Sequence, residues 1–296
     1  MKNKNKFLLG IVTMTAAGVL AACSNSNTGS SSSKQVMNTA TSNEISTLDS
    51  SKYGDTTSSE ALQNSMEGLY HFDKNNRAKL AGATSVNVSK DQRVYTYNLR
   101  KNAKWSNGDP VTAQDYVTGW HRTVDPKNSS LDSDSYAIIK NGTKITQGKA
   151  KVNSLGIKAL GRYRLQVTLA DPIPYLPEIL EGAQFYPQDT KVVNKLGSKY
   201  GTSSKTYWNK KSVNLDKVNV QVVQTTSTGV NLFRSGSLDY TPLSSDFVKQ
   251  YQNNENYHTQ TTPTNGYMTF NLKRKTTGNV HVRRAISQAI NKKTIS

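Results

Sequence analysis

Residues that could carry catalytic or metal chemistry are few and widely separated in this chain. The histidines show no HExxH pattern, and no Cys or carboxylate stands at metal-ligand spacing from any of them. The positions concerned are His71, His121, His258 and His281. We therefore expect no metal site.

Other catalytic patterns are equally weak. The stretch GTKITQGK at 142–149 resembles a phosphate-binding loop, but it has one intervening residue too many and is followed by Ala150 instead of Ser or Thr. We expect a surface turn there. No GxSxG elbow occurs, and paired acids such as Asp132 and Asp134 are typical of solvated loops. The sequence therefore predicts a protein that is not an enzyme and needs no cofactor.

The N-terminus has the pattern of an export signal. Three lysines within the first six residues precede a run of 14 uncharged, mostly apolar residues from Phe7 to Leu20. The exit Leu-Ala-Ala-Cys at 20–23 resembles the bacterial lipoprotein signal, in which the Cys is acylated and the bond before it is cut. We expect a signal peptide at 1–22, a lipid on Cys23, and a flexible Ser/Asn/Gly-rich linker over 23–35. The expected location is the outer face of the cell membrane, in a Gram-positive-type bacterium.

Composition limits both the kind of core that this protein can have and the partners that it can bind. The 296 residues are 34% hydrophobic and 20% charged, with one Cys and a mean hydropathy of −0.65, so a core held by packing without disulfides is expected. The formal net charge of +18 leaves nucleic acid, anionic membrane or acidic wall polymer as partners. Because an exported protein does not meet DNA, we expect no nucleic-acid partner.

Local patterns predict a mixture of strands and helices. Alternation at Tyr95, Tyr97 and Leu99 and at 163–169 indicates two half-buried strands, and the valines of 218–222 indicate another. A capping box of Thr57 and Glu60 predicts a helix that presents Leu62, Met66 and Leu69 on one face. Further helices are expected over 113–122 after an Asn-Gly turn, through 230–233, and around 282–290; 267–272 is expected to form a strand.

The stretch LRKNAKWSNGDPVTAQDYVTGWHRTVDP at 99–126 carries a family resemblance. It resembles the signature of the extracellular oligopeptide-binding proteins of ABC importers, solute-binding protein family 5. The resemblance continues in EISTLDS, MEGLYHFD, LGIKALGRYRLQVTLADPIPYL, LFRSGSLDYTPLS and VRRAISQAI, in that order along the chain. Trp105 and Trp120 belong to this signature, and we interpret both as packing residues.

This resemblance implies an α/β, periplasmic-binding-protein-like clamp of two lobes that encloses an extended peptide by strand-like backbone pairing. The first lobe would span 36–270, with an inserted subdomain at about 59–158, and a second lobe would begin at 271–296. The peptide-binding residues implied are Glu44, Ile45, Ser46, Asn265, Gly266 and Tyr267. Judged without the family, Ile45 is better explained as a core residue and Tyr267 as an ordinary strand aromatic. The implied partners are oligopeptides, the membrane permease subunits and, through Cys23, the lipid bilayer, with the protein itself a monomer.

The sequence departs from the family in two places. The segment usually found between YGTSSK and YWNKK is absent, and the chain stops one helix into the expected second lobe, so we expect a truncated form with an internal deletion. The last 25 residues contain seven Lys or Arg and no Asp or Glu. An alternative function therefore stays open, namely a non-transport remnant or a surface adhesin that binds anionic wall polymers.

Overall fold

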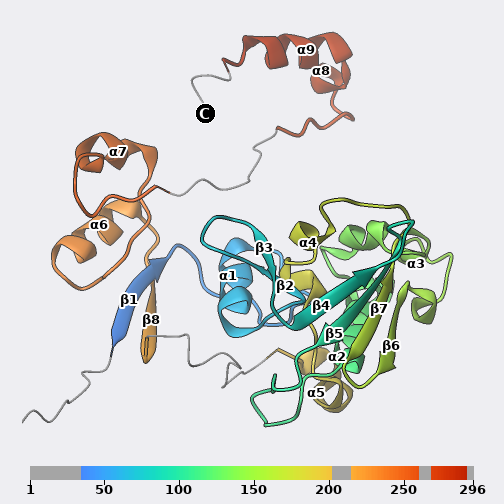
Figure 1. The fold of residues 1–296 in the computed structure, drawn as a ribbon. Helices are drawn as coiled ribbons and strands as arrows, with labels where there is room; N and C mark the ends of the chain where they lie inside the picture. The colour runs from blue at the N-terminus through green and yellow to red at the C-terminus, as the bar shows by residue number, and fades with distance from the viewer. Residues whose placement is uncertain (1–34, 202–214, 260–267, 292–296) are drawn as a thin grey trace, which may run out of the picture.

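The computed structural model describes residues 35–201, 215–259 and 268–291, and Figure 1 shows how their elements are arranged. The described strands are β1 (Val36–Thr41), β2 (Tyr70–Phe72), β3 (Ala78–Leu80), β4 (Ala83–Val88), β5 (Val94–Leu99), β6 (Ile157–Gly161), β7 (Arg164–Thr168) and β8 (Lys217–Val222). The described α-helices are α1 (Thr56–Ser65), α2 (Ala113–Val124), α3 (Gly142–Thr146), α4 (Leu176–Ile179), α5 (Thr190–Leu196), α6 (Thr226–Arg234), α7 (Ser245–Tyr251), α8 (Lys275–Gly278) and α9 (Val280–Ala289).

The larger part of the fold is built on an antiparallel sheet with the strand order β4-β5-β7-β6. In β5 and β7, Tyr97 pairs with Leu165 and Tyr95 with Val167, and all four side chains are buried. Asn98, between the buried Tyr97 and Leu99, is exposed. The period-2 alternation thus divides the sheet into one face that joins the core and one face that meets solvent, as the sequence predicts.

Helix α2 covers the buried face of this sheet. Thr112 is its N-cap, as expected, and the preceding turn closes through the Gly108 N–H, which donates to the Trp105 carbonyl over 2.9 Å. Gly108 has φ +88, a left-handed conformation that favours glycine. The turn and the helix start are therefore both fixed by local chemistry.

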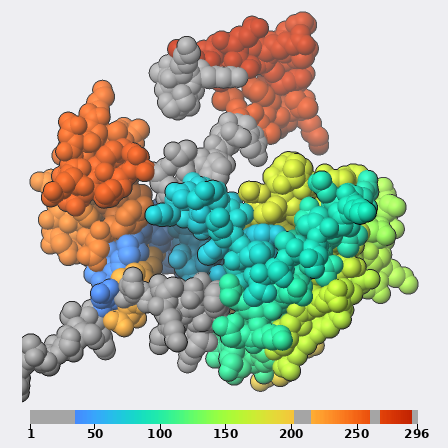
Figure 2. All heavy atoms as spheres, viewed as in Figure 1, coloured from blue at the N-terminus to red at the C-terminus, as the bar shows by residue number. Residues whose placement is uncertain are grey.

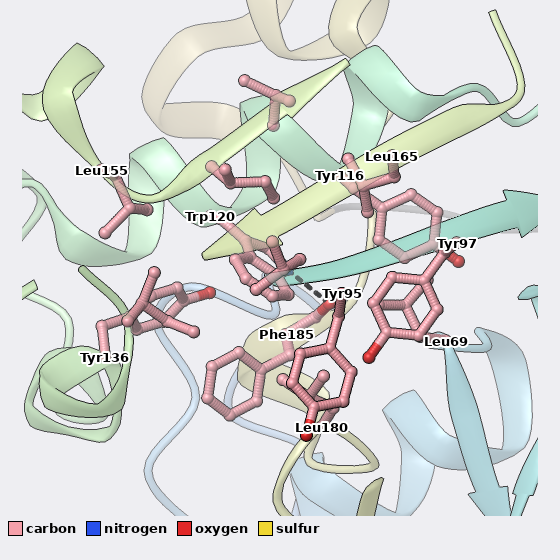
Figure 3. Packing of buried hydrophobic residues seen from close by; sticks show 14 of the residues in the cluster. Leu69, Tyr95, Tyr97, Tyr116, Trp120, Tyr136, Leu155, Leu165, Leu180 and Phe185 are labelled. Atoms are coloured by element: carbon pink, nitrogen blue, oxygen red, sulfur yellow. Dashed lines mark hydrogen bonds between the residues drawn. The ribbon is translucent and has the colours of Figure 1, made fainter. Parts of the chain in front are cut away.

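An aromatic cluster fills the space between α2 and the chain that follows β7 (Figure 3). The Trp120 ring meets Tyr136 and Phe185 edge-on, with centroids 5.6 and 5.4 Å away, and its Nε1 donates to the Phe185 carbonyl over 2.8 Å. Trp120 has no exposed surface. It is a packing residue, as predicted, because its large apolar ring and its single donor are both satisfied inside the protein.

The smaller part of the fold is a narrow parallel sheet of β1 and β8, drawn in blue and orange beside the larger body in Figures 1 and 2. β1 also bridges to Tyr240 through Thr39, so three chain segments lie side by side. Helix α6 follows β8 and buries Val230 against this part, together with Leu238. The predicted strand at 218–222 and the helix through 230–233 are confirmed.

Helix α1 differs from its prediction at both ends. Asp55 is the N-cap, and its carboxylate accepts the Ser58 N–H over 2.7 Å, so the expected cap at Thr57 is wrong by two residues. The helix ends at Ser65, and Leu69 lies beyond it in the main core. Asp55 is favoured because a second partner, Ser46, also binds its carboxylate.

Two further expectations fail and one holds. GTKITQGK is not only a turn, because its first five residues form α3, with Ile145 buried. The described part of the expected strand at 267–272, from Met268 onward, is not a strand, and no described segment pairs with it. A strand needs a neighbour for its N–H and C=O groups, and local alternation cannot supply one. The expected last helix is present as α9.

Candidate functional site

The segment Glu44–Ile45–Ser46 leaves the end of β1 and passes the N-terminus of α1. All three residues are exposed, and the Ile45 side chain has 48% of its surface accessible. The residue-level interpretation of Ile45 as a core residue is therefore wrong. The chain turns away from the sheet immediately before this position, so the alternation of β1 no longer determines which side is buried.

Ser46 fastens this segment to α1. Its Oγ donates to Asp55 Oδ2 over 2.5 Å, and its N–H donates to Ser58 Oγ over 3.0 Å. The Ser46 hydroxyl, followed by the Ser58 N–H, lowers the pKa of Asp55 below its usual value. The side chain of Ser46 is thus a structural clamp, and its contribution to a site is to hold its two neighbours in place.

The backbone of Glu44 and Ile45 is available for binding. Among the residues that the structure describes, none makes a hydrogen bond to the N–H or C=O of either residue. Exposed backbone groups without partners can pair with a second strand. The segment therefore offers donors and acceptors of the kind that an extended peptide backbone needs.

A groove of about 1020 Å³ lies directly beside this segment. β1 and β8 contribute one side of its lining and α1 the other. Ile45, the chain at 215–216, the chain from 223 into α6 and the chain at 240–242 also contribute. Thr41 Oγ1 and Thr57 Oγ1 approach to 3.2 Å where β1 comes next to α1. The sequence does not predict this groove, because the Val218–Val222 alternation indicates a strand but not that its valines stay exposed.

The signature stretch at 99–126 forms part of the scaffold and does not line this groove. Asp115, 5% exposed, accepts the Thr112 N–H on Oδ2 over 2.8 Å and the Thr190 N–H on Oδ1 over 3.0 Å. Trp105 Nε1 donates to the same Oδ2 over 3.2 Å. One buried carboxylate thus joins the turn, the start of α2 and the start of α5. The packing role predicted for Trp105 agrees with this arrangement, since none of the signature residues lines the groove.

A buried ion pair holds the chain that follows the 44–46 segment. Arg122 binds both carboxylate oxygens of Asp49, at 3.2 and 2.9 Å, and the Asp49 side chain is 1% exposed. The guanidinium also donates to Gln188 and lies 5.1 Å from the centre of the Tyr200 ring. This network anchors residues 49–51 to α2, because Gln188 Nε2 donates onward to Ser51 Oγ over 2.7 Å.

Elsewhere in the described part of the chain, burial shifts the pKa of individual titratable groups. In the described ranges, no three His, Cys, Asp or Glu side chains are grouped to hold a metal ion. Burial raises the pKa of Asp132 and lowers that of His121, whereas Asp134 is exposed. The expectation of a solvated loop thus fails for Asp132, which is partly buried close to Tyr53.

The remaining predicted site residues lie outside the described part of the chain. These are Cys23, Asn265, Gly266 and Tyr267. Of the helices that the structure does describe, none has the length and apolar character to cross a bilayer.

Comparison with known proteins identifies the family. A model of the bacterial extracellular solute-binding proteins, family 5, middle region, matches residues 78–206 and 198–296. The dipeptide-binding protein of Lactococcus lactis subsp. cremoris is 32% identical over 96% of this chain and 57% of its own length. The periplasmic oligopeptide-binding protein OppA of Escherichia coli is 31% identical over 77% of this chain and 48% of its own length.

Solved structures agree with this match. Listeria monocytogenes OppA bound to peptide aligns with a TM-score of 0.70 and 39% identity, over 76% of this chain and 49% of that one. The pheromone receptor PrgZ aligns with a TM-score of 0.81 and 32% identity, over 89% of this chain and 58% of the PrgZ chain. The chain therefore spans about half the length of the relatives it matches, and its α/β fold is confirmed as that of part of a periplasmic-binding-protein-like clamp. It belongs to the bacterial extracellular solute-binding proteins, family 5.

Proposed function

We propose that this chain is the extracytoplasmic peptide-binding component of an ABC importer, which captures oligopeptides and delivers them to permease subunits in the membrane. The observation that carries the proposal is the backbone of Glu44 and Ile45, to which no described residue forms a hydrogen bond, beside a groove large enough for several side chains. Backbone pairing gives affinity that does not depend on ligand sequence, which suits a general peptide carrier. The peptide-bound relative supports this assignment by analogy.

The proposal includes several features that follow from sequence alone. Cys23 would carry the lipid that holds the protein at the outer face of the membrane, and Asn265–Tyr267 would complete the peptide site. The first lobe would comprise 36–270 with the inserted subdomain at about 59–158, and 271–296 would begin the second. The protein would act as a monomer without a catalytic step. A Cys23→Ala variant tests the anchor, because it should move the protein from the membrane fraction to the medium.

Ile45→Pro is the sharpest test of peptide pairing. Proline removes the N–H that would donate to the ligand, and in the described structure this N–H has no partner to lose. We expect peptide affinity, measured by calorimetry on the full chain, to fall about tenfold to a hundredfold, since a bound carbonyl is left unsatisfied. The melting temperature should stay near that of the wild type, and the control Ile45→Val should bind normally.

The adhesin alternative rests on the net charge, which is +18 for the whole chain and +15 once residues 1–22 with their three lysines are removed, and it makes an opposite prediction. Binding to anionic polymer would collapse as salt shortens the Debye length from about 30 to 3 Å. Peptide pairing in a groove should persist over that range. Equal binding of peptide by the wild type and Ile45→Pro would refute backbone pairing at Ile45. Loss of all peptide binding in high salt would refute the peptide-binding proposal.

A further inference from the structure

The floor of the groove is a row of exposed side chains on three adjacent segments. Thr39 in β1 pairs with Val220 in β8 on one side and with Tyr240 on the other. Because laterally paired residues project from the same face of a sheet, these three side chains lie in one row. Val220 is 55% exposed, Tyr240 54% and Val218 48%, so the floor is apolar and uncovered by any described residue.

One face of α1 forms the opposite wall. Thr57, Glu60, Ala61 and Asn64 all line the groove, and their spacing of three and four residues places them on one side of a helix. Leu62 points elsewhere and is fully buried in a separate cluster. The wall is polar and the floor apolar, so the two sides would contact different parts of a ligand.

The charge of this groove is opposite to that of the whole chain. Its charged lining residues are Glu60, Asp216 and Lys217, while the chain as a whole has 38 basic and 20 acidic residues. Glu44 and Asp55 add two more carboxylates at the end next to the 44–46 segment. No described residue forms an ion pair with Glu60. A cation entering the groove would thus meet an uncompensated carboxylate on α1.

From these observations we propose that the groove selects peptides that combine a bulky apolar side chain with a positive charge. This inference rests on the proposed peptide-binding function. A peptide paired with Glu44 and Ile45 directs every second side chain to the same side, and Ile45 itself lines the groove. An apolar ligand side chain on that side covers Val220 and Tyr240, and a basic group reaches Glu60 across the groove.

The test compares four pentapeptides by calorimetry on the full chain: pentaalanine, its central-leucine form, and central-leucine forms with a neighbouring lysine or glutamate. We expect the leucine peptide to bind about tenfold more tightly than pentaalanine, because it adds buried methyl and methylene groups. Val220→Thr, which keeps the shape but adds a hydroxyl, should remove most of that gain. The matched control is Val88→Thr, since Val88 is 46% exposed on β4 and does not line the groove.

The charge arm uses the lysine and glutamate peptides. At low salt, the lysine peptide should bind severalfold more tightly than the glutamate peptide. Glu60→Gln should abolish most of this preference. Asp134→Asn, which lies outside the groove, should leave the preference in place. Equal binding of all four peptides would overturn the inference and leave the peptide-binding function intact. Binding of none would overturn both. A dimer that persists when the leucine peptide is added would show that a second copy occupies the groove, and would also overturn the inference.

Discussion

Removing the guanidinium of Arg122 should destabilise the protein strongly. Arg122 binds both oxygens of Asp49, whose side chain is 1% exposed, while Arg122 itself is 16% exposed. In Arg122→Met the Asp49 carboxylate stays buried without its counter-charge, and Gln188 Oε1 loses the N–H that donates to it. Breaking a buried pair in this way costs about 3–5 kcal/mol of unfolding free energy. That is a large share of the roughly 5–15 kcal/mol that holds a typical protein folded.

The assay is urea unfolding followed by tryptophan fluorescence, with the midpoint and the slope fitted separately. The matched control is Lys191→Met, which removes an ion pair of similar length, 3.0 Å from Lys191 Nζ to Asp109 Oδ1. In this pair the Lys191 side chain is 77% exposed. It should cost no more than about 1 kcal/mol. The double variant Asp49→Leu with Arg122→Met should be more stable than Arg122→Met alone, because no unpaired charge remains. An Arg122→Met protein within about 1 kcal/mol of the wild type at an unchanged slope would refute the reasoning.

Three further changes have defined outcomes. Ser46→Ala should raise the pKa of Asp55, followed by NMR titration, because the hydroxyl is the main group that lowers it; an unmoved pKa would contradict the clamp. Trp120→Ala should lower the unfolding free energy by about 3–5 kcal/mol, and a cost below 1 kcal/mol in the same urea assay would show that the cluster is not tightly packed. Burial lowers the pKa of His121, so protonation of this side chain favours the unfolded state. The stability contributed by the neutral side chain is fully present above about pH 6.5, and it is lost as the pH falls through the lowered pKa of the folded state. His121→Gln should therefore flatten the fall in melting temperature between pH 7 and 5, and identical pH profiles would contradict this.

Local sequence was sufficient where one segment's own chemistry decides its structure. The alternation in β5 identified Tyr95 and Tyr97 as buried, and Thr112 was correctly expected to start α2. The family resemblance was also readable, because its signature is a contiguous run that forms a turn and a helix. The choice of cap for α1 could not be read from local sequence, since Asp55 and Thr57 are both good caps. A hydrogen bond from Ser46, nine residues before Asp55, favours Asp55.

The candidate site depends on contacts that no local pattern contains. β1 and β8 are joined across 181 residues, as in the bond from the Gln35 N–H to Asp216, and this pairing alone places Val220 next to Thr39. Ile45 reads as a core residue by type, yet it is exposed because the chain leaves the sheet just before it. The sequence by itself determined the family, and it predicted elements such as the strands β5 and β7 and the helix α2. Only the tertiary structure decided which apolar residues stay uncovered, because burial is set by segments that meet in space and not by neighbours along the chain.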